Sequence, residues 1–190
     1  MIRIGILGDI GSGKSYVAQS FGYPVFNADY EVSKLYKKNR KVYQKLKKLL
    51  PEYICEFPID KIQLSKAILA NNSNLKKIVK IVHKEIRLKM YSFIKKNKNR
   101  KIIILDIPLL LENKINKKKD ILIYVNSKKV DILNNLKKRK NFNIKIYKKF
   151  KEIQLPLDYK KKSSQFIIRN KFTKKSVNVD IQKILKKLKN

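Results

Sequence analysis

Short runs of apolar, mostly β-branched residues alternate along the chain with stretches in which apolar positions recur every three or four residues. The runs that predict buried strands are Ile2–Leu7, Tyr23–Ala28, Lys101–Ile107, Asp120–Val125 and Gln165–Arg169. The stretches with a helical period are Val32–Leu50, Ile59–Leu69, Leu75–Ile94 and Val177–Leu188. This alternation predicts an α/β fold, in which a parallel sheet of about five strands is flanked by helices.

Two insertions interrupt the alternation, and each is long enough to serve a ligand. About 70 residues separate the second and third predicted strands, far more than one crossover helix needs. We therefore predict a helical substrate-binding region over residues 31–98 and a lysine-rich helical lid over residues 128–163. The remainder forms the core of a single domain spanning residues 1–190, and comprises residues 1–30, 99–127 and 164–190.

Lysine dominates the polar positions. The chain of 190 residues has 48 Lys and Arg against 14 Asp and Glu, which gives a formal net charge of +34. Such a charge is typical of proteins that bind nucleic acid or membrane surfaces. However, only six of the basic residues are arginine, the lysines are spread along the chain, and Lys, Ile and Asn share A/T-rich codons. This pattern favours compositional drift over a surface selected for a polyanion.

Other features of composition limit the class of protein. Cys55 is the sole cysteine, so an internal disulfide is impossible and a reducing cytoplasm is the expected location. No stretch approaches the roughly 20 apolar residues of a membrane span, and the apolar run at the N-terminus is too short for a secretory signal. We expect a cytoplasmic monomer with no membrane partner and no dedicated nucleic-acid partner.

Glycine is concentrated in one segment, GDIGSGKS (Gly8–Ser15), directly after the first predicted strand and before a predicted helix. The segment matches the phosphate-binding pattern G-x-x-x-x-G-K-[ST] in the required context. Glycine permits left-handed turns and lets backbone N–H groups approach phosphate oxygens. In this pattern Lys14 reaches the β- and γ-phosphates of ATP, and Ser15 coordinates Mg²⁺. The predicted nucleotide-binding residues are Gly8, Asp9, Ile10, Gly11, Ser12, Gly13, Lys14, Ser15 and Tyr16.

Asp29 lies just past the second predicted strand, at the edge where doubly wound sheets bind ligands. A carboxylate at that position can accept the proton of a substrate hydroxyl, which is the role of the base in a kinase. Alternatively, Asp29 or the neighbouring Asn27 caps the helix that follows. The two roles are compatible.

Six segments, in chain order, resemble the dephospho-coenzyme A kinase family. They are LGDIGSGKS, NADYEVSKLY, VHKEIRLKM, LDIPLLLEN, LKKRKNF and QLPLDYKKKSSQFIIRN. The first is shared by a whole superfamily, whereas the second and the last two are close to family-specific. The resemblance covers nearly the whole chain and implies a P-loop kinase fold. It also implies that ATP phosphorylates the ribose 3′-hydroxyl of dephospho-CoA, giving coenzyme A and ADP.

The resemblance implies a role for each matching residue. Asp29 would be the general base, Lys14 would act on ATP, and Ser15 would hold Mg²⁺. Arg139, in the lid, would brace the transferring phosphoryl group. His83 and Arg87 are four residues apart and so share one helix face. The implied substrate-binding residues are Asp29, His83, Arg87, Asp106, Pro108 and Leu109.

Several of these residues have a simpler structural interpretation. His83 alone is typical of a helix surface, and Asp106 can cap a turn instead of holding Mg²⁺ through water or positioning Asp29. Arg139 can belong to a solvated lysine-rich face. Lys160 matches the end of the lid segment and can contact phosphate, although many lysines lie near it in the sequence.

Four residues depart from the family pattern. Asp9 replaces a glycine inside the loop, where its charge is unfavourable near ATP unless it points outward or pairs with a lysine. Lys84 stands where a proline commonly follows the histidine. Asn135 replaces a first lid arginine, and Arg169 replaces an aspartate. These changes bear on catalytic efficiency more than on identity.

Two rival functions fit part of the sequence. Another small P-loop kinase would keep Gly8–Ser15 without needing the other segments, and a screen of acceptor substrates separates it from the family above. A basic nucleic-acid-binding NTPase is supported only by the net charge, because the Tyr and Phe residues are scattered rather than arranged along a basic groove.

Overall fold

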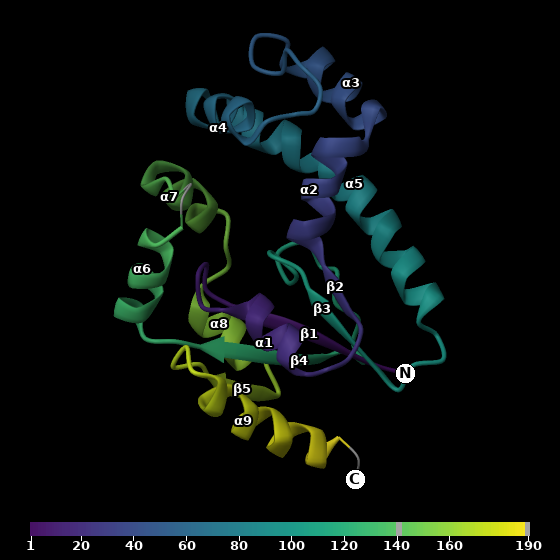
Figure 1. Cartoon of the computed structure of the whole chain (residues 1–190), viewed down its shortest axis with the longest axis vertical. Helices are drawn as coiled ribbons and strands as arrows, with labels where there is room; N and C mark the ends of the chain where they lie inside the picture. The colour runs from purple at the N-terminus through teal and green to yellow at the C-terminus, as the bar shows by residue number, and fades with distance from the viewer. Residues whose placement is uncertain (140–141, 189–190) are drawn as a thin grey trace. The chain divides into compact units, whose positions relative to one another are not determined.

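The computed structural model describes residues 1–139 and 142–188 and is shown in Figure 1. The chain forms two units. The first, Met1–Asn27 with Asn97–Asn190, contains the sheet, and we call it the sheet unit. The second, Ala28–Lys96, consists of helices, and we call it the helical unit. Each unit is described by itself.

The sheet unit is built on five parallel strands, close to the runs that the sequence predicted. They are β1 (Ile2–Gly8), β2 (Val25–Asn27), β3 (Ile102–Asp106), β4 (Ile121–Asn126) and β5 (Phe166–Arg169). The strand order is β2-β3-β1-β4-β5, and every neighbouring pair is parallel. Every residue of β3 is buried, as expected for a parallel strand covered on both faces. The predicted parallel sheet is confirmed.

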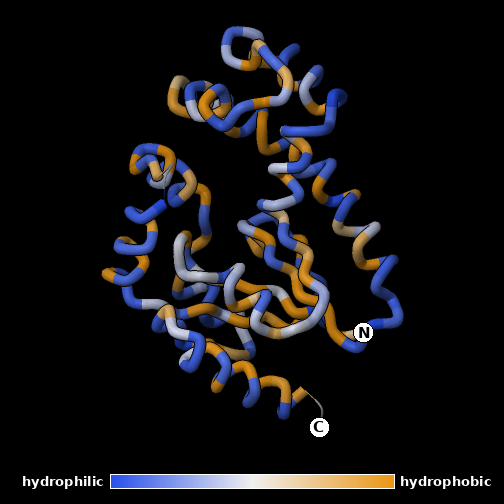
Figure 2. The backbone as a smooth tube through the Cα atoms, viewed as in Figure 1, coloured by the Kyte–Doolittle hydropathy of each residue, from blue (hydrophilic) through white to orange (hydrophobic). Residues whose placement is uncertain are grey.

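Helices of the sheet unit cover this sheet and form the region after β4. They are α1 (Lys14–Ser20), α6 (Lys129–Lys137), α7 (Ile144–Glu152), α8 (Leu157–Lys162) and α9 (Lys174–Lys187). Val177, Ile181 and Ile184 of α9 follow a helical period and join the core under the sheet. Figure 2 shows the result, with hydrophobic positions recurring along α9 between polar ones.

The helical unit contains α2 (Ala28–Lys38), α3 (Arg40–Leu49), α4 (Lys61–Ala70) and α5 (Asn72–Lys96). Helix α5 is 25 residues long, and α2, α3 and α4 all contact it. Its buried apolar residues, Leu75, Ile78, Val82, Ile86 and Met90, recur every three or four positions. Nowhere in residues 1–139 and 142–188 is a helix both long and apolar enough to cross a membrane.

The structure corrects the predicted helical stretch Val32–Leu50, which is two helices. The break falls at Asn39, whose side chain accepts a hydrogen bond from the backbone N–H of Val42 (3.0 Å) and so caps α3. Leu35, Val42 and Leu46 are buried on either side of the break. Because the apolar period continues across Asn39, periodicity alone did not reveal it.

Candidate active site

The predicted phosphate-binding loop connects β1 to α1. Two of its positions have no room for a side chain and therefore need glycine. Gly11 and Gly13 have φ values of +83° and +87°, in the left-handed region that favours glycine. A Cβ atom at Gly11 would lie 2.8 Å from Cγ of Leu136 in α6, and one at Gly13 would clash with Nδ2 of Asn170. The loop backbone is therefore packed directly against α6 and against the residue that follows β5.

Two polar side chains hold the middle of this loop. The carbonyl oxygen of Ser12 accepts hydrogen bonds from Nδ2 of Asn170 and from Oγ of Ser127, both at 2.9 Å. Asn170 is 2% exposed, and its Oδ1 accepts a hydrogen bond from the backbone N–H of Phe172 (2.8 Å). Fixing this carbonyl also fixes the planar peptide that it shares with Gly13. The loop is thus shaped from the ends of β4 and β5.

The sequence pattern assigns no role to Asn170 or Ser127, although Asn170 ends the last of the segments that resemble the family. A signal was present, because each follows a predicted strand closely on the edge where parallel sheets bind ligands. A polar residue at that place is nevertheless common in turns, so the pattern could not distinguish a loop support from an ordinary turn.

Lys14 and Asp9 are joined at the start of the loop. Nζ of Lys14 donates to the carbonyl oxygens of Gly8 (3.2 Å) and Asp9 (2.7 Å). The Asp9 carboxylate accepts from the backbone N–H of Ile10 (2.7 Å) and forms an ion pair with Lys151 of α7 (2.5 Å). The sequence required that an aspartate in this loop point outward or pair with a lysine, and the structure confirms the pairing.

Ser15, Asn27 and Asp106 meet at the carboxyl ends of β2 and β3. The register of these strands places Asn27 opposite Asp106. Nδ2 of Asn27 donates to Oδ2 of Asp106 (2.6 Å) and lies 3.4 Å from Oγ of Ser15. Asp106 is 3% exposed. The structure thus associates Asp106 with Ser15 and adds Asn27, which the sequence analysis considered only as a helix cap.

The donor atoms of this group fit a Mg²⁺ ion that arrives with a nucleotide. Mg²⁺ takes oxygen ligands and is usually held by one or two protein groups together with phosphate oxygens and waters. Ser15 offers a hydroxyl and Asp106 a carboxylate. Within the described ranges, no three His, Cys, Asp or Glu side chains are grouped to hold a metal by themselves. A metal here would therefore depend on the phosphates.

Pro108 and Leu109 lie in the turn that follows β3. Leu109 has a φ of +59°, a conformation that is unfavourable for a residue with a branched side chain. Its carbonyl oxygen is held by Asn113, through the backbone N–H (3.1 Å) and through Nδ2 (2.9 Å). Backbone strain of this kind is often found at functional sites, and the place of Leu109 in a binding site stays a prediction.

Lys160, for which the sequence left a contact with phosphate open, is buried. The residue is 3% exposed, and its Nζ lies 2.6 Å from Oε1 of Glu112. The same oxygen accepts a hydrogen bond from the backbone N–H of Leu155 (3.0 Å). The ammonium group therefore connects α8 to the turn after β3 and is withdrawn from the surface.

Arg139 lies just after α6 and is exposed. Its backbone N–H donates to the carbonyl oxygen of Leu136 (3.1 Å), and its carbonyl accepts from the N–H of Phe142 (3.0 Å). The next two residues of the lid segment quoted above, 140 and 141, lie outside the described residues. Tyr16, in α1, is also exposed at 43%.

The remaining predicted residues, Asp29, His83 and Arg87, belong to the helical unit. Asp29 is exposed in the first turn of α2, while His83 and Arg87 lie one turn apart on α5, half-buried and exposed respectively. Helices α2 and α5 pack together, and Glu31 pairs with Lys89 (3.1 Å).

Burial and charge act in opposite directions on Glu31. Burial alone would raise the pKa of its carboxyl group, but hydrogen bonds and charge from Lys89 and Lys34 outweigh this effect. The pKa of Glu31 is therefore lowered, which keeps the link between α2 and α5 ionised near neutral pH.

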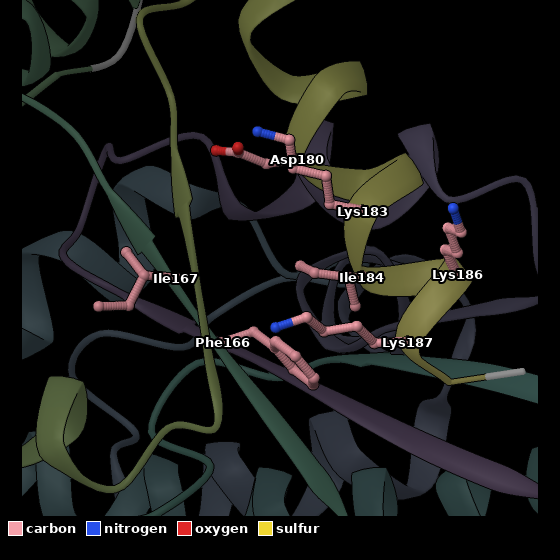
Figure 3. A pocket seen from close by; sticks show the side chains of 7 residues that line it. All are labelled: Phe166, Ile167, Asp180, Lys183, Ile184, Lys186 and Lys187. Atoms are coloured by element: carbon pink, nitrogen blue, oxygen red, sulfur yellow. The ribbon is translucent and has the colours of Figure 1, made fainter. Parts of the chain in front are cut away.

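A surface hollow of about 430 Å³ lies along β5 and α9 (Figure 3). Its lining residues are Phe166, Ile167, Asp180, Lys183, Ile184, Lys186 and Lys187. None of them is among the residues that the sequence assigned to ATP or substrate. Within the sheet unit, the candidate site therefore consists of the loop and the strand ends described above.

Comparisons with known proteins agree with the geometry. A family model described as Dephospho-CoA kinase matches residues 2–175. The dephospho-CoA kinase of Wolbachia pipientis wMel is 34% identical over 190 residues, covering 97% of each protein.

Solved structures share the fold. TT1252 from Thermus thermophilus has a TM-score of 0.80 at 23% identity, covering 98% of this chain and 97% of that one. The dephospho-CoA kinase from Campylobacter jejuni has a TM-score of 0.64 at 20% identity, covering 98% and 96%. The predicted P-loop kinase fold is confirmed.

Proposed function

Since the chain belongs to the dephospho-CoA kinase family, we propose how its own residues carry out the family reaction. This reaction is the ATP-dependent phosphorylation of dephospho-CoA at the ribose 3′-hydroxyl, the last step of coenzyme A biosynthesis, with ADP as the second product. The observation that carries the assignment is the family match over residues 2–175. The intact phosphate-binding loop supports it.

ATP would bind along the loop from Gly8 to Tyr16. Lys14 would exchange the carbonyl oxygens of Gly8 and Asp9, which its ammonium contacts at 3.2 and 2.7 Å, for oxygens of the β- and γ-phosphates. Ser15 and Asp106 would hold Mg²⁺, which when bound neutralises charge on the phosphates. Asn27 would orient Asp106 by donating to its Oδ2.

Asp29 would act as the general base. The substrate 3′-oxygen would attack the γ-phosphorus, the bond to the β,γ-bridging oxygen would break, and the hydroxyl proton would pass to the Asp29 carboxylate. Arg139 would stabilise the charge on the transferring group. His83, Arg87, Pro108 and Leu109 would bind dephospho-CoA, with Arg87 suited to its anionic groups.

A coupled ADP-release assay with MgATP tests the reaction. Dephospho-CoA, AMP, CMP, adenosine, RNA and buffer are compared as acceptors, and the product is analysed for the position of the new phosphate. We expect turnover with dephospho-CoA alone and a 3′-phosphorylated product. If dephospho-CoA does not increase ADP release while another acceptor or RNA does, the proposal is overturned. A cytoplasmic monomer remains a prediction of the sequence.

A further inference from the structure

The ion pair between Asp9 and Lys151 joins the phosphate-binding loop to helix α7. The Asp9 side chain is 12% exposed and the Lys151 side chain is 37% exposed, so the carboxylate is much the more enclosed of the two groups. Oδ1 of Asp9 also accepts from the N–H of Ile10 (2.7 Å), which directs the carboxylate along the loop. The contact connects residues 142 positions apart in the sequence.

An enclosed carboxylate at this position opposes the binding of a triphosphate. Like charges repel more strongly where water is excluded, because the effective dielectric constant is lower. The Asp9 charge is felt by its surroundings, since burial and the charges of Asp9 and Asp158 raise the pKa of Tyr124 in β4. Nζ of Lys14 donates to the backbone carbonyl oxygen of Asp9 (2.7 Å), whereas Nζ of Lys151 contacts the carboxylate itself.

We propose that Lys151 is a positioning residue for ATP. Its ammonium group neutralises the Asp9 carboxylate and thereby makes this loop compatible with the ATP phosphates. The inference rests on the proposed nucleotide site at Gly8–Ser15. Lys151 acts through Asp9 and does not itself bind the nucleotide. One member of the lysine-rich lid is thus assigned a defined task, which general drift toward lysine does not explain.

The chain offers substitutions that remove each charge with little change of shape. Asp9→Asn keeps an Oδ1 acceptor for the N–H of Ile10, and Lys151→Met keeps a long side chain on α7. Lys148→Met removes the same charge from an exposed position of the same helix and serves as the matched control. The fourth variant carries both Asp9→Asn and Lys151→Met.

The KM for ATP and the kcat are measured for the four variants and the wild type, at low and at moderate salt. We expect Lys151→Met to raise the KM for ATP about fivefold, with kcat changed less than about twofold, because Asp9 is left unpaired beside the phosphates. Asp9→Asn should lower the KM for ATP by about twofold. The double variant should match Asp9→Asn within about twofold, which is the signature of coupling between the two residues.

Two outcomes would overturn the proposal. If Lys151→Met has no more effect than Lys148→Met, Lys151 has no special role. If the double variant binds ATP as poorly as Lys151→Met alone, Lys151 acts on the nucleotide directly and not through Asp9. Thermal unfolding of each variant, together with rescue by Lys151→Arg, distinguishes a general loss of folding from the loss of this pair.

Calorimetric titration with MgATP separates this proposal from the proposed reaction. The titration requires no turnover, so the rank order of the four variants can be measured even if dephospho-CoA is not phosphorylated. If dephospho-CoA is not phosphorylated but calorimetry gives the expected rank order of ATP affinities, the proposed reaction is rejected and the role of the Asp9–Lys151 pair is retained. If dephospho-CoA is phosphorylated but the two substitutions show no coupling, the proposed reaction is retained and the role of the Asp9–Lys151 pair is rejected.

Discussion

The two units hold their predicted site residues in different ways. In the sheet unit, the predicted Asp106 and the loop support Asn170 are enclosed and hydrogen-bonded, at 3% and 2% exposed, whereas Arg139 is exposed. In the helical unit Asp29 and Arg87 are exposed on helices whose buried faces are apolar. A substitution in the sheet unit should therefore affect stability and reaction together, whereas one on the helical unit should separate them.

The largest expected effect would separate chemistry from stability in the helical unit. Asp29→Asn should lower kcat by about 10³-fold, because a positioned general base contributes on that order. It should cost about 0.5 kcal/mol of unfolding free energy, since the residue is exposed and loses its favourable charge in the first turn of α2. Steady-state kinetics and urea denaturation measure the two quantities. A kcat within about tenfold of the wild type would remove Asp29 as the base.

Lys160→Met tests the opposite behaviour in the sheet unit. We expect a loss of about 3 kcal/mol in unfolding free energy, because Glu112 is left with an uncompensated charge in an enclosed site. Lys161→Met, one residue along at an exposed position, should change it by less than about 0.5 kcal/mol. Urea denaturation decides. Weakened ATP use with unchanged stability would show that Lys160 contacts phosphate and would break the contrast between the units.

Asn170→Asp examines whether a support of the loop serves folding and binding together. The substitution keeps an acceptor for the N–H of Phe172 but loses the donor to the Ser12 carbonyl. We expect a loss of about 2 kcal/mol in stability, together with a raised KM for ATP, because the fixed peptide of the loop is released. Ser127→Ala removes the other donor and should cost about 1 kcal/mol. A normal KM for ATP in Asn170→Asp would limit Asn170 to a structural role.

The smallest expected effect concerns Glu31, which ties α2 to α5. Glu31→Gln should lower the unfolding free energy by about 1 kcal/mol near neutral pH. The pKa of Glu31 is lowered from its ordinary value of 4.5, so its contribution is present above that pH and is lost as the pH falls through the folded-state pKa. The difference between variant and wild type should therefore vanish in acid, with kcat unchanged near neutral pH. A pH series of urea denaturation curves checks the sign.

Much of the fold could be predicted from the sequence, because the patterns that specify strands and the phosphate-binding loop involve residues that are close in the chain. The apolar runs identified all five strands, and the spacing of Gly8–Ser15 identified the loop. The pairing of Asn27 with Asp106 was not readable, since β2 has three residues and its register on β3 is fixed by tertiary contacts across a long insertion. A single capping residue, Asn39, likewise divided a helix whose apolar period gave no sign of a break.

The lysines show most clearly what the sequence could not predict, namely which of them form enclosed ion pairs. The sequence indicated that Asp9 points outward or pairs with a lysine, but it gave no means of choosing Lys151 among so many candidates. In the same way LDYKKK presents three lysines alike, and only the orientation of α8 selects Lys160 for burial. Hydrophobic pattern specifies which residues are inside only when the buried residues are apolar. A buried cation is specified by its partner, here Glu112, which lies far away in the sequence.

The hydrogen bond from Asn170 to Ser12 spans 158 residues. The loop that begins the chain is therefore completed by a residue that the ribosome adds much later, after β5 has been made and can pair with β4. A nascent chain that ends before Asn170 carries the whole phosphate-binding motif but lacks one of the two side chains that hold the Ser12 carbonyl. The ability to bind ATP is thus expected to appear late in synthesis, once β5 has paired with β4 and the sheet is complete.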